Sequence, residues 1–144
     1  MSLIVGPGVV EWVAKRTNEF GNFGCANGIG WKRDDIVAGV VYANWNGPNV
    51  ECHIASDGSR KWLNRMYLWA MFDYPFCQLK AKRITVCIGE GNSDSRRFVE
   101  HLGVTRETTL SRAHPTGDLL VYRMFSEECE WISRDFSKKY AKAA

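Results

Sequence analysis

The sequence lacks an uncharged hydrophobic run long enough to cross a membrane. Its longest apolar stretch, residues 62–76, is interrupted by Asn64, Arg65, Asp73 and Pro75. A helix that spans a bilayer needs about 20 predominantly apolar residues. The first residues also carry no cluster of positive charge and too short an apolar run for a secretory signal. We therefore expect a cytoplasmic protein that does not bind a membrane.

The sequence also lacks a strong charge of either sign and any closely spaced pair of cysteines. Its 19 basic and 16 acidic residues give a net charge of +3, which is a weak indication of a polyanionic partner. The five cysteines are scattered and form no C-x-x-C pair, so the usual zinc and redox motifs are missing. We expect reduced thiols that lie mostly in the core, and no metal site.

What is present is the composition of one folded domain. The chain has 144 residues, of which 45% are hydrophobic and 24% are charged, as is usual for a globular protein of this length. We therefore expect residues 1–144 to form a single domain. Aromatic residues are numerous, with six Trp, seven Phe and five Tyr, and many of them fall in two segments, residues 12–31 and 62–76.

Local patterns in the first half predict helices on either side of a β-hairpin. Apolar spacing indicates the first helix, and the turn residues Asn46-Gly47-Pro48-Asn49 separate two runs rich in β-branched side chains. Pro75 should end the second helix. The predicted elements are a helix at 9–20, a loop marked by glycines at 21, 24, 28 and 30, a β region from residue 29, strands at 36–45 and 50–55, and a helix at 60–74.

The second half predicts a strand, a short helix and a final hairpin. These elements lie at 84–88, 94–102, and 104–110 with 119–125. Because a helix separates the strands at 50–55 and 84–88, we expect these two strands to be parallel, with a right-handed crossover. The order of elements predicts an α/β fold.

Residues 92–104 carry a recognisable motif. The run Asn-Ser-Asp-Ser-Arg-Arg-Phe-Val-Glu-His-Leu-Gly-Val resembles the N-x-x-S/A…E-x-L-G-F signature of the GNAT acetyltransferases, particularly their RimJ/RimL-like branch. Further matches follow at Glu107, Arg112, Gly117, Asp118, Tyr122 and Met124. The resemblance covers about residues 29–125 and leaves 126–144 as a C-terminal tail. It implies an α/β (α+β) fold whose mixed central sheet, flanked by helices, is splayed between two parallel strands.

The resemblance implies acetyl-CoA as the acyl donor, bound where the strands at 50–55 and 84–88 diverge. Unpaired backbone groups from Ile54 to Ser56 would pair with the pantetheine amides as an added strand does. The start of a helix near Ser59 would hold the pyrophosphate, because free N–H groups and the helix dipole attract anions. Asn92 would contact the pantetheine, cap the helix that follows, or do both. The implied donor-binding residues are Ile54, Ala55, Ser56, Gly58, Ser59, Arg60, Lys61, Asn92, Ser95 and Arg96.

The sequence departs from the family in two places. The pyrophosphate loop Q/R-x-x-G-x-G/A corresponds here to Ser-Asp-Gly-Ser-Arg-Lys-Trp at 56–62, which keeps one glycine and places the acidic Asp57 beside a phosphate. Arg60 and Lys61 would compensate for this charge. Many members use a Tyr to protonate the leaving thiolate, and the matching residue here is Val99. Ser95 or a water molecule is then the candidate acid.

Two titratable residues lie on the strand where the family places its general base. Glu51 and His53 alternate with core residues, so both side chains face the same side of the strand, about 7 Å apart along it. Either could accept the acceptor's proton directly or through water. The alternative is that Glu51 is solvated and that His53 is a hydrogen-bonded structural residue. Glu90 is a third candidate. The resemblance also places Trp12, Phe20, Phe23 and Trp31 in a segment that walls the acceptor pocket.

We therefore predict an acyl-CoA-dependent N-acyltransferase that moves an acetyl group from acetyl-CoA to an amine. The transfer would be direct, in a ternary complex, with no metal and no covalent enzyme intermediate. The amine could belong to a small molecule, a protein or a nucleobase, and a homodimer is left open. The alternative is a catalytically silent module of the same fold that binds a protein or nucleic acid. The incomplete pyrophosphate loop and the missing Tyr support this alternative.

Overall fold

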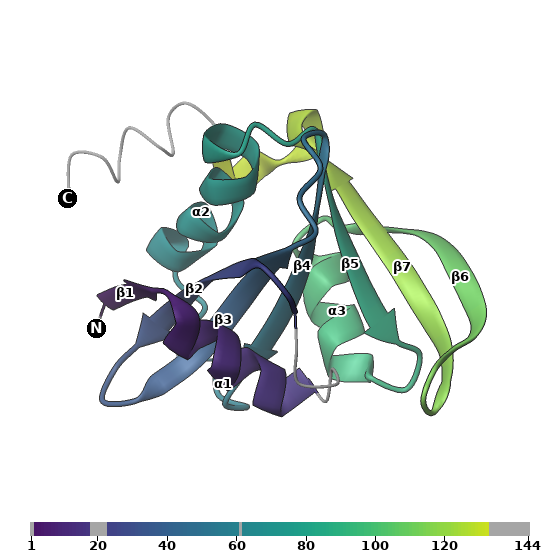
Figure 1. Cartoon of the computed structure of the whole chain (residues 1–144), viewed down its shortest axis with the longest axis horizontal. Coiled ribbons are helices and arrows are strands. Elements are labelled where there is room, and N and C mark those ends of the chain that lie inside the picture. Colours follow the sequence, from purple (N-terminus) through teal and green to yellow (C-terminus); the bar gives the residue numbers. More distant parts are fainter. Residues whose placement is uncertain (1, 18–22, 61, 133–144) are drawn as a thin grey trace.

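The computed structural model describes residues 2–17, 23–60 and 62–132. Its strands form one seven-stranded mixed sheet with the order β1-β2-β3-β4-β5-β7-β6 (Figure 1). The elements are β1 (Ser2–Val5), α1 (Pro7–Thr17), β2 (Ala26–Lys32), β3 (Ile36–Ala43), β4 (Asn49–Ser56), α2 (Arg65–Asp73), the π-helical turn η1 (Tyr74–Gln78), β5 (Arg83–Gly89), α3 (Ser93–His101), β6 (Thr105–His114), β7 (Gly117–Phe125), and the 3₁₀ turns η2 (Ser126–Glu128) and η3 (Glu130–Ile132). Within the described ranges, no helix is both long and apolar enough to cross a bilayer.

The strand pairings predicted from the sequence are confirmed. β3 and β4 form the antiparallel hairpin, β4 and β5 are the parallel pair, and β6 and β7 form the final hairpin. β7 lies between β5 and β6, which leaves β6 at the edge of the sheet. The short edge strand β1, which pairs with β2, was not predicted.

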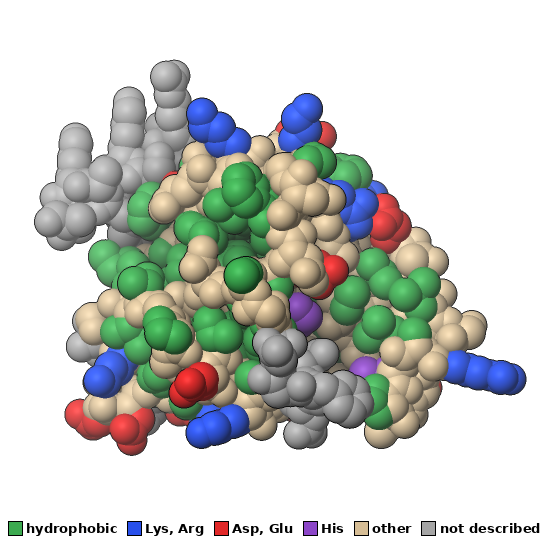
Figure 2. All heavy atoms as spheres, viewed as in Figure 1, with side chains coloured by type: hydrophobic (Ala, Val, Ile, Leu, Met, Phe, Trp, Pro, Cys, Tyr) green, Lys and Arg blue, Asp and Glu red, His purple; other side chains and the backbone are tan. Residues whose placement is uncertain are grey.

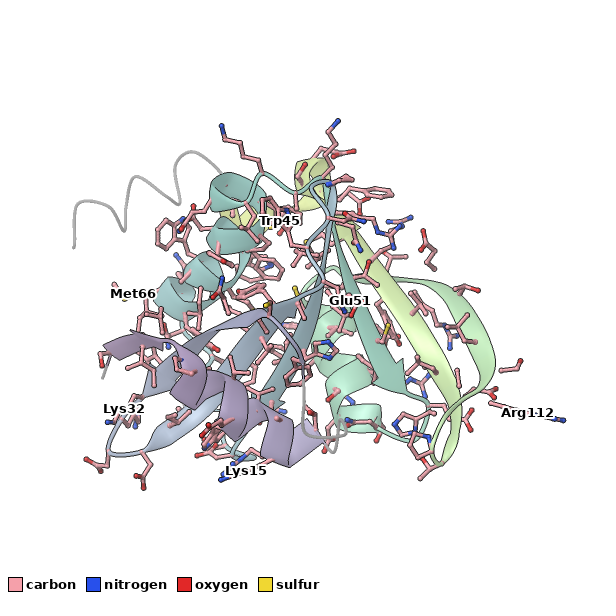
Figure 3. The ribbon with its side chains drawn as sticks, in the orientation of Figure 1. Lys15, Lys32, Trp45, Glu51, Met66 and Arg112 are labelled. Carbon is pink, nitrogen blue, oxygen red and sulfur yellow. The ribbon has the colours of Figure 1, made fainter. Side chains whose placement is uncertain are left out.

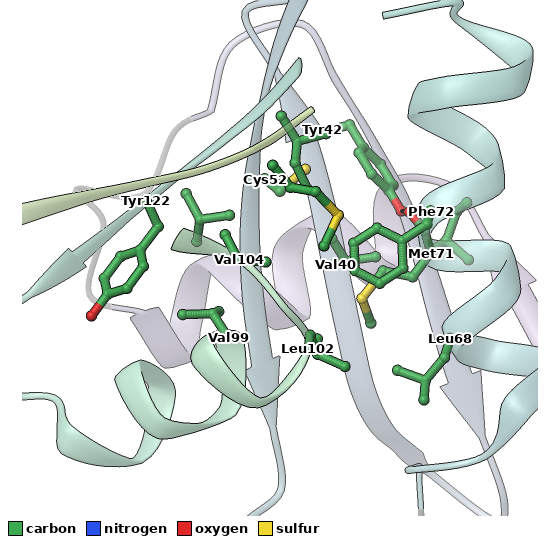
Figure 4. Close-up of a cluster of buried hydrophobic side chains, with 14 of the residues drawn as sticks. Val40, Tyr42, Cys52, Leu68, Met71, Phe72, Val99, Leu102, Val104 and Tyr122 are labelled. Atoms are coloured by element: carbon green, nitrogen blue, oxygen red, sulfur yellow. Dashed lines mark hydrogen bonds between the residues drawn. The ribbon is translucent and has the colours of Figure 1, made fainter. Parts of the chain in front are cut away.

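Helices cover the two faces of the sheet unequally. α1 packs over β2, β3 and β4 on one face, around Val9, Val13 and Val41. α2 and α3 pack on the other face and enclose the larger core, in which Met71 of α2 and Val99 of α3 meet residues of the central strands (Figure 4). On the α1 face, no helix of the described chain lies over β5, β7 and β6 (Figure 1).

Glycines in β2 and β3 allow α1 to approach the sheet closely. A Cβ at Gly39 would lie 2.7 Å from Cγ2 of Val13, and one at Gly28 would lie 2.9 Å from Cβ of Val9. Gly28 and Gly30 both lie inside β2, so the loop predicted from these two glycines is wrong. They serve helix–sheet contact and not chain reversal.

The second helix begins later than predicted and does not end at its proline. α2 begins at Arg65, because Asn64 is the N-cap and its Oδ1 accepts the backbone N–H of Tyr67 at 2.9 Å. After α2 the chain continues through Pro75 as the π-helical turn η1. Pro75 lies in the first turn of η1, where its missing N–H is tolerated.

Near the two ends of the described chain, the structure agrees only partly with the elements predicted from the sequence. α1 ends at Thr17, and Phe20, which was expected within this helix, lies outside the described residues. Toward the C-terminus, Nε1 of Trp131 donates to the carbonyl of Leu102 at 3.2 Å, and its ring stacks on Phe72. Trp131 therefore anchors the segment that follows β7.

None of the five cysteines, all of which the structure describes, forms a disulfide, but only some of them lie in the core. Cys52 and Cys129 are buried, Cys87 is half-buried, and Cys25 and Cys77 are exposed. Burial raises the pKa of Cys129 to about 11 and raises the pKa of Cys52 well above its usual value. The expectation of core thiols therefore holds for Cys52 and Cys129.

Candidate active site

The two parallel strands separate after a short paired stretch. Asn49–Glu51 of β4 pairs with Arg83–Thr85 of β5, after which β4 continues along β3 to Ser56 and β5 continues along β7 to Gly89. We call the region between the unpaired ends of β4 and β5 the splay. Its closed end lies at Glu51, where the two strands meet (Figure 3). The splayed sheet predicted from the family resemblance is therefore present.

The backbone of β4 directs polar groups into the splay. The N–H of Asp57 donates to the carbonyl of Val37 at 2.9 Å, and Ala55 lies opposite Gly39 in the antiparallel register. Because backbone groups alternate between the two sides of a strand, those of Ala55 face β3, whereas those of Ile54 and Ser56 face the splay. Amide groups of a bound ligand could pair with them as a further strand does.

The loop after β4 uses its own side chains to occupy its N–H groups. Oγ of Ser56 accepts the N–H of Gly58 at 3.2 Å, and Oδ1 of Asp57 accepts the N–H of Ser59 at 2.9 Å and its hydroxyl at 2.6 Å. The predicted helix start near Ser59 is wrong, because α2 begins at Arg65. The structure therefore has a carboxylate where an anion-binding helix terminus was expected.

Of the predicted cationic residues, the structure describes Arg60 and Arg96. Arg60 is exposed in a bend that follows Ser59, and Lys61 lies outside the described residues. Arg96 lies in α3 and its Nη1 donates to the carbonyl of Glu90 at 3.0 Å. Part of the Arg96 guanidinium thus holds the turn between β5 and α3.

The start of α3 lies at the same end of the sheet as this loop, because β4 and β5 are parallel. Asn92 is the N-cap of α3, and its Oδ1 accepts the N–H of Ser95 at 3.2 Å. Ser95 is half-buried and precedes the buried Val99 by one helical turn, so it lies on the side of α3 that faces the sheet. The side-chain amide of Asn92 keeps its donor nitrogen for a second partner.

Glu51 and His53 lie together on the α1 face, at the closed end of the splay. Nε2 of His53 is 3.8 Å from Oε2 of Glu51, and their side chains are 13% and 36% exposed, respectively. The alternation read from the sequence is therefore correct. Ser95 lies on the opposite side of the sheet, on α3, so the candidate base and the candidate acid approach the splay from different faces.

Two neighbours of this pair come from outside β4: Asn44, which was not singled out from the sequence, and Phe23, which was expected in the acceptor wall. Nδ2 of Asn44 donates to Oε2 of Glu51 at 3.0 Å, and the ring of Phe23 lies 4.6 Å from that of His53. Asn44 has a φ of 53°, a left-handed conformation that Asn adopts more readily than most residues. An Asn at the end of a strand, just before a turn, was the one signal available for it.

The other predicted acceptor-side aromatics separate in the fold. Phe23 and Trp12 lie on the α1 face, whereas Trp31 is buried in the core on the opposite face, with its ring 6.0 Å from that of Tyr67. Trp31 therefore does not share a face with Phe23 and Trp12. Side chains alternate along β2, so Trp31, which pairs with Ala38, points away from the α1 face on which Gly28 and Gly30 lie.

Two further observations bear on the chemistry available. Glu90, the third candidate base, is exposed, and its N–H donates to the carbonyl of Asp118 at 3.0 Å in the turn after β5. Among the described residues, no group of His, Cys, Asp and Glu side chains is arranged to hold a metal ion. The titratable side chains brought together at the closed end of the splay are Glu51 and His53.

No protein-family model and no curated protein sequence matches this chain. Solved structures do match it. A variant of the spermidine N-acetyltransferase SpeG from Vibrio cholerae has a TM-score of 0.70 and 14% identity, over 93% of this chain and 97% of that one. The ribosomal-protein-S5-alanine acetyltransferase from Vibrio fischeri has a TM-score of 0.61 and 16% identity, over 74% of this chain and 63% of that one. A probable acetyltransferase has a TM-score of 0.61 and 18% identity, over 72% of this chain and 62% of that one.

This chain thus spans less than two thirds of the latter two proteins and nearly the whole length of the first. At these identities, the likeness establishes the fold and not the reaction. The neighbours are acetyltransferases, and their mixed sheet with its parallel central pair is the one found here. The chain has the fold of the GNAT acetyltransferases.

Proposed function

We propose that this chain is an N-acyltransferase that moves an acetyl group from acetyl-CoA to an amine by direct transfer in a ternary complex. The observation that carries the proposal is the position of the Glu51–His53 pair, 3.8 Å apart, at the closed end of a splay between two parallel strands. The named activity of the structural neighbours supports acyl transfer. The motif in residues 92–104 supports the RimJ/RimL-like branch.

The Glu51–His53 pair would remove the proton from the acceptor. An amine is protonated near neutral pH and attacks a thioester only after it loses a proton. Glu51 is more exposed than His53, so it is the first group that an incoming ammonium meets. His53, held between Glu51 and the ring of Phe23, would accept the proton directly or through water.

The donor would lie along the unpaired side of β4. Backbone groups of Ile54 and Ser56 would pair with the pantetheine amides, and the free donor nitrogen of Asn92 would bind the same arm. Ser95, on the other side of the sheet from the base, would supply a proton to the leaving thiolate. The pyrophosphate part fits less well, because Asp57 already occupies the N–H of Ser59.

A calorimetric titration with acetyl-CoA tests the donor assignment, and Glu51→Gln tests the base. We expect binding in the micromolar range, and a fall in kcat of about 100-fold in Glu51→Gln with donor affinity unchanged. His53→Ala should lower kcat as well. Unchanged turnover in both variants would overturn the assignment of the base, whereas an absence of binding at millimolar acetyl-CoA would overturn the proposed function.

A second candidate is a catalytically silent module that binds a protein or nucleic acid. The position of Asp57 favours it, because this carboxylate stands where a donor's phosphate would bind. A band shift with DNA or RNA that weakens steeply as salt rises would support the nucleic-acid form of this candidate. A nucleobase acceptor would instead show acetyl transfer to the nucleic acid.

A further inference from the structure

The α1 face of the sheet continues beyond α1 as an apolar surface. Thr85 of β5 lies opposite Glu51, and the next residues on this face of β5 are Cys87 and Gly89. Cys87 lies opposite Val121 of β7, and Gly89 lies opposite Leu119. Leu119 in turn lies opposite Leu110 of β6. We call Cys87, Leu110, Leu119 and Val121 the apolar wall.

The apolar wall is accessible and adjoins the Glu51–His53 pair. Leu110 is 46% exposed, and the other members of the wall are half-buried. Figure 2 shows hydrophobic side chains gathered over β5, β7 and β6, beside the centre of this face. Thr85 pairs with Glu51, and on these parallel strands Cys87 and His53 each lie two residues beyond that pair. The wall therefore starts across the splay from His53.

Charges near the wall are largely neutralised by one another. Nη2 of Arg83 is 2.9 Å from Oε2 of Glu107, and Nε of Arg123 is 3.7 Å from the same carboxylate. Nη1 of Arg123 also lies 3.1 Å from Glu128. These arginines and carboxylates lie toward the end of β5 away from Gly89. Both of these carboxylates, those of Glu107 and Glu128, are therefore already paired with arginine and do not offer a partner to a second cation on the wall.

At its far end the wall is bounded by His114, whose ring lies over Gly89, and by Glu90, which follows Gly89. The Glu90 carboxylate lies over Gly117, and the residue is exposed. From Thr85 to Gly89 the strand rises about 13 Å. A chain of six carbons, whose amine lies at Glu51 and His53, is shorter than this and would end near Cys87 and Val121, before it reaches His114 or Glu90.

We infer that the acceptor is a primary amine carried by an apolar body, with its ammonium at Glu51 and His53 and its body on the apolar wall. This rests on the proposed function and names the class of acceptor for that site. A carboxylate and an imidazole suit the ammonium, while a second charge placed on the wall would lose water without gaining a partner. An amine with an apolar tail is the occupant that satisfies both parts of the surface.

Three amines with the same six-carbon chain test this inference: hexylamine, 1,6-diaminohexane and 6-aminohexanoate. They differ in whether the far end is a methyl group, an ammonium or a carboxylate. With acetyl-CoA as donor, and acetylated product measured by liquid chromatography, kcat/KM for hexylamine should exceed that of each charged analogue by about tenfold or more. Calorimetric binding of the amines to the chain saturated with CoA should follow the same order.

Val121→Asp places a carboxylate on the wall and should reverse the preference between hexylamine and 1,6-diaminohexane. Leu110→Asp, on the exposed edge strand, provides a second variant should Val121→Asp fail to fold. The matched control is Val5→Asp, because Val5 is 76% exposed on β1 at the other edge of the sheet. This control should leave the ratio of the two amines unchanged.

The outcomes separate this inference from the proposed function. Turnover in which 1,6-diaminohexane, spermidine or 6-aminohexanoate equals or exceeds hexylamine would overturn the inference alone. No product from any amine, in a chain that fails to bind acetyl-CoA, would overturn both. A dimer that Val121→Asp converts to monomer in sedimentation would also overturn it, since the wall would then belong to a second copy of the chain.

Discussion

Asp57 accepts hydrogen bonds from both the backbone and the hydroxyl of Ser59, and so occupies a donor that an incoming phosphate would use. Two effects then oppose donor binding at this loop. The N–H of Ser59 must exchange one acceptor for another, and the Asp57 carboxylate repels the phosphate oxygens. The left-handed φ of 92° at Gly58 keeps the loop tight, so the carboxylate stays in place. In the proposed donor site, the feature least favourable to binding is therefore the side chain of Asp57.

Replacing Asp57 by Ala should tighten the binding of acetyl-CoA. The gain should be about fivefold, since two unit charges about 4 Å apart in water interact by roughly 1 kcal/mol. Calorimetric titrations of both proteins measure it. Asp35→Ala is the control, because Asp35 lines the same surface hollow as Asp57 without bonding to Ser59. Equal or weaker binding in Asp57→Ala would show that the loop needs this carboxylate for its shape.

Glu107 gives a pH-dependent contribution to stability. The hydrogen bond from Arg83, together with the charges of Arg83 and Arg123, holds the pKa of Glu107 below its usual value. A folded pKa below the unfolded one stabilises the fold above the unfolded pKa, and this contribution is lost as the pH falls through the folded pKa. Glu107→Gln should therefore lower the free energy of unfolding at about pH 7 and not at about pH 2, well below the usual carboxyl pKa.

Urea unfolding at the two pH values measures this difference. Glu11→Gln, on the exposed side of α1, is the matched control and should show no such dependence on pH. A Glu107→Gln variant that is equally destabilised at both pH values would contradict the ion-pair explanation and indicate a packing role for this side chain.

Among the elements, the contact of α1 with β2 and β3 depends on missing side chains. Gly39→Ala should destabilise the fold by about 1–3 kcal/mol, because the new Cβ would lie 2.7 Å from Val13 and 3.0 Å from Val9, both fully buried. Gly8→Ala is the control within α1. A Cβ there meets nothing within 4 Å, so this change should stabilise the helix by about 0.5–1 kcal/mol.

Thermal or urea unfolding of the two variants compares these opposite effects. If Gly39→Ala were as stable as the original chain, α1 would have to move away from the sheet without cost. In that case the Phe23 ring, which follows α1, would also be able to shift relative to His53. Gly39 would then have no special role in positioning the Phe23 ring.

The sequence predicted those elements whose pattern is local and missed those that depend on distant partners. The alternation in β4 and the β-branched runs in β3 and β5 identify strands without any knowledge of neighbours. Gly28 and Gly30 carry no such pattern, and their place in β2 follows from Val9 of α1 packing against them. The late start of α2 follows from Asn64 acting as N-cap, whereas the sequence pattern predicted a helix start near Ser59.

At the candidate site too, features with a local sequence pattern were predicted and features that depend on distant residues were missed. Alternation alone put Glu51 and His53 on one face, and the structure adds a distance of 3.8 Å between them. Neither Asn44 nor Phe23 could be assigned to this pair, because each reaches it from another part of the chain. The apolar wall also depends on three strands brought together by the sheet order, in which β7 lies between β5 and β6.

Across the whole molecule, the splay lies between two differently covered faces. α1 and the apolar wall lie on one face with Glu51 and His53, while α2 and α3 lie on the other. The loop that follows Ser56 leads to α2, and the loop that carries Asn92 leads into α3. We therefore expect the donor to bind from the α2 and α3 side and the amine from the α1 side. Both substrates can then be present at once, as direct transfer requires.

This arrangement predicts sequential kinetics. Double-reciprocal plots at several fixed amine concentrations should intersect, and CoA should compete with acetyl-CoA but not with the amine. The contrary result would be parallel lines together with an acetyl group on Cys87, the thiol that lies on the α1 face across the splay from His53. In that reaction the Cys87 sulfur would bond to the acetyl carbon as the CoA thiol leaves, and the amine would later displace it. Mass spectrometry of the chain with acetyl-CoA alone separates the two routes, because direct transfer leaves the protein mass unchanged, whereas the covalent route adds an acetyl group to Cys87.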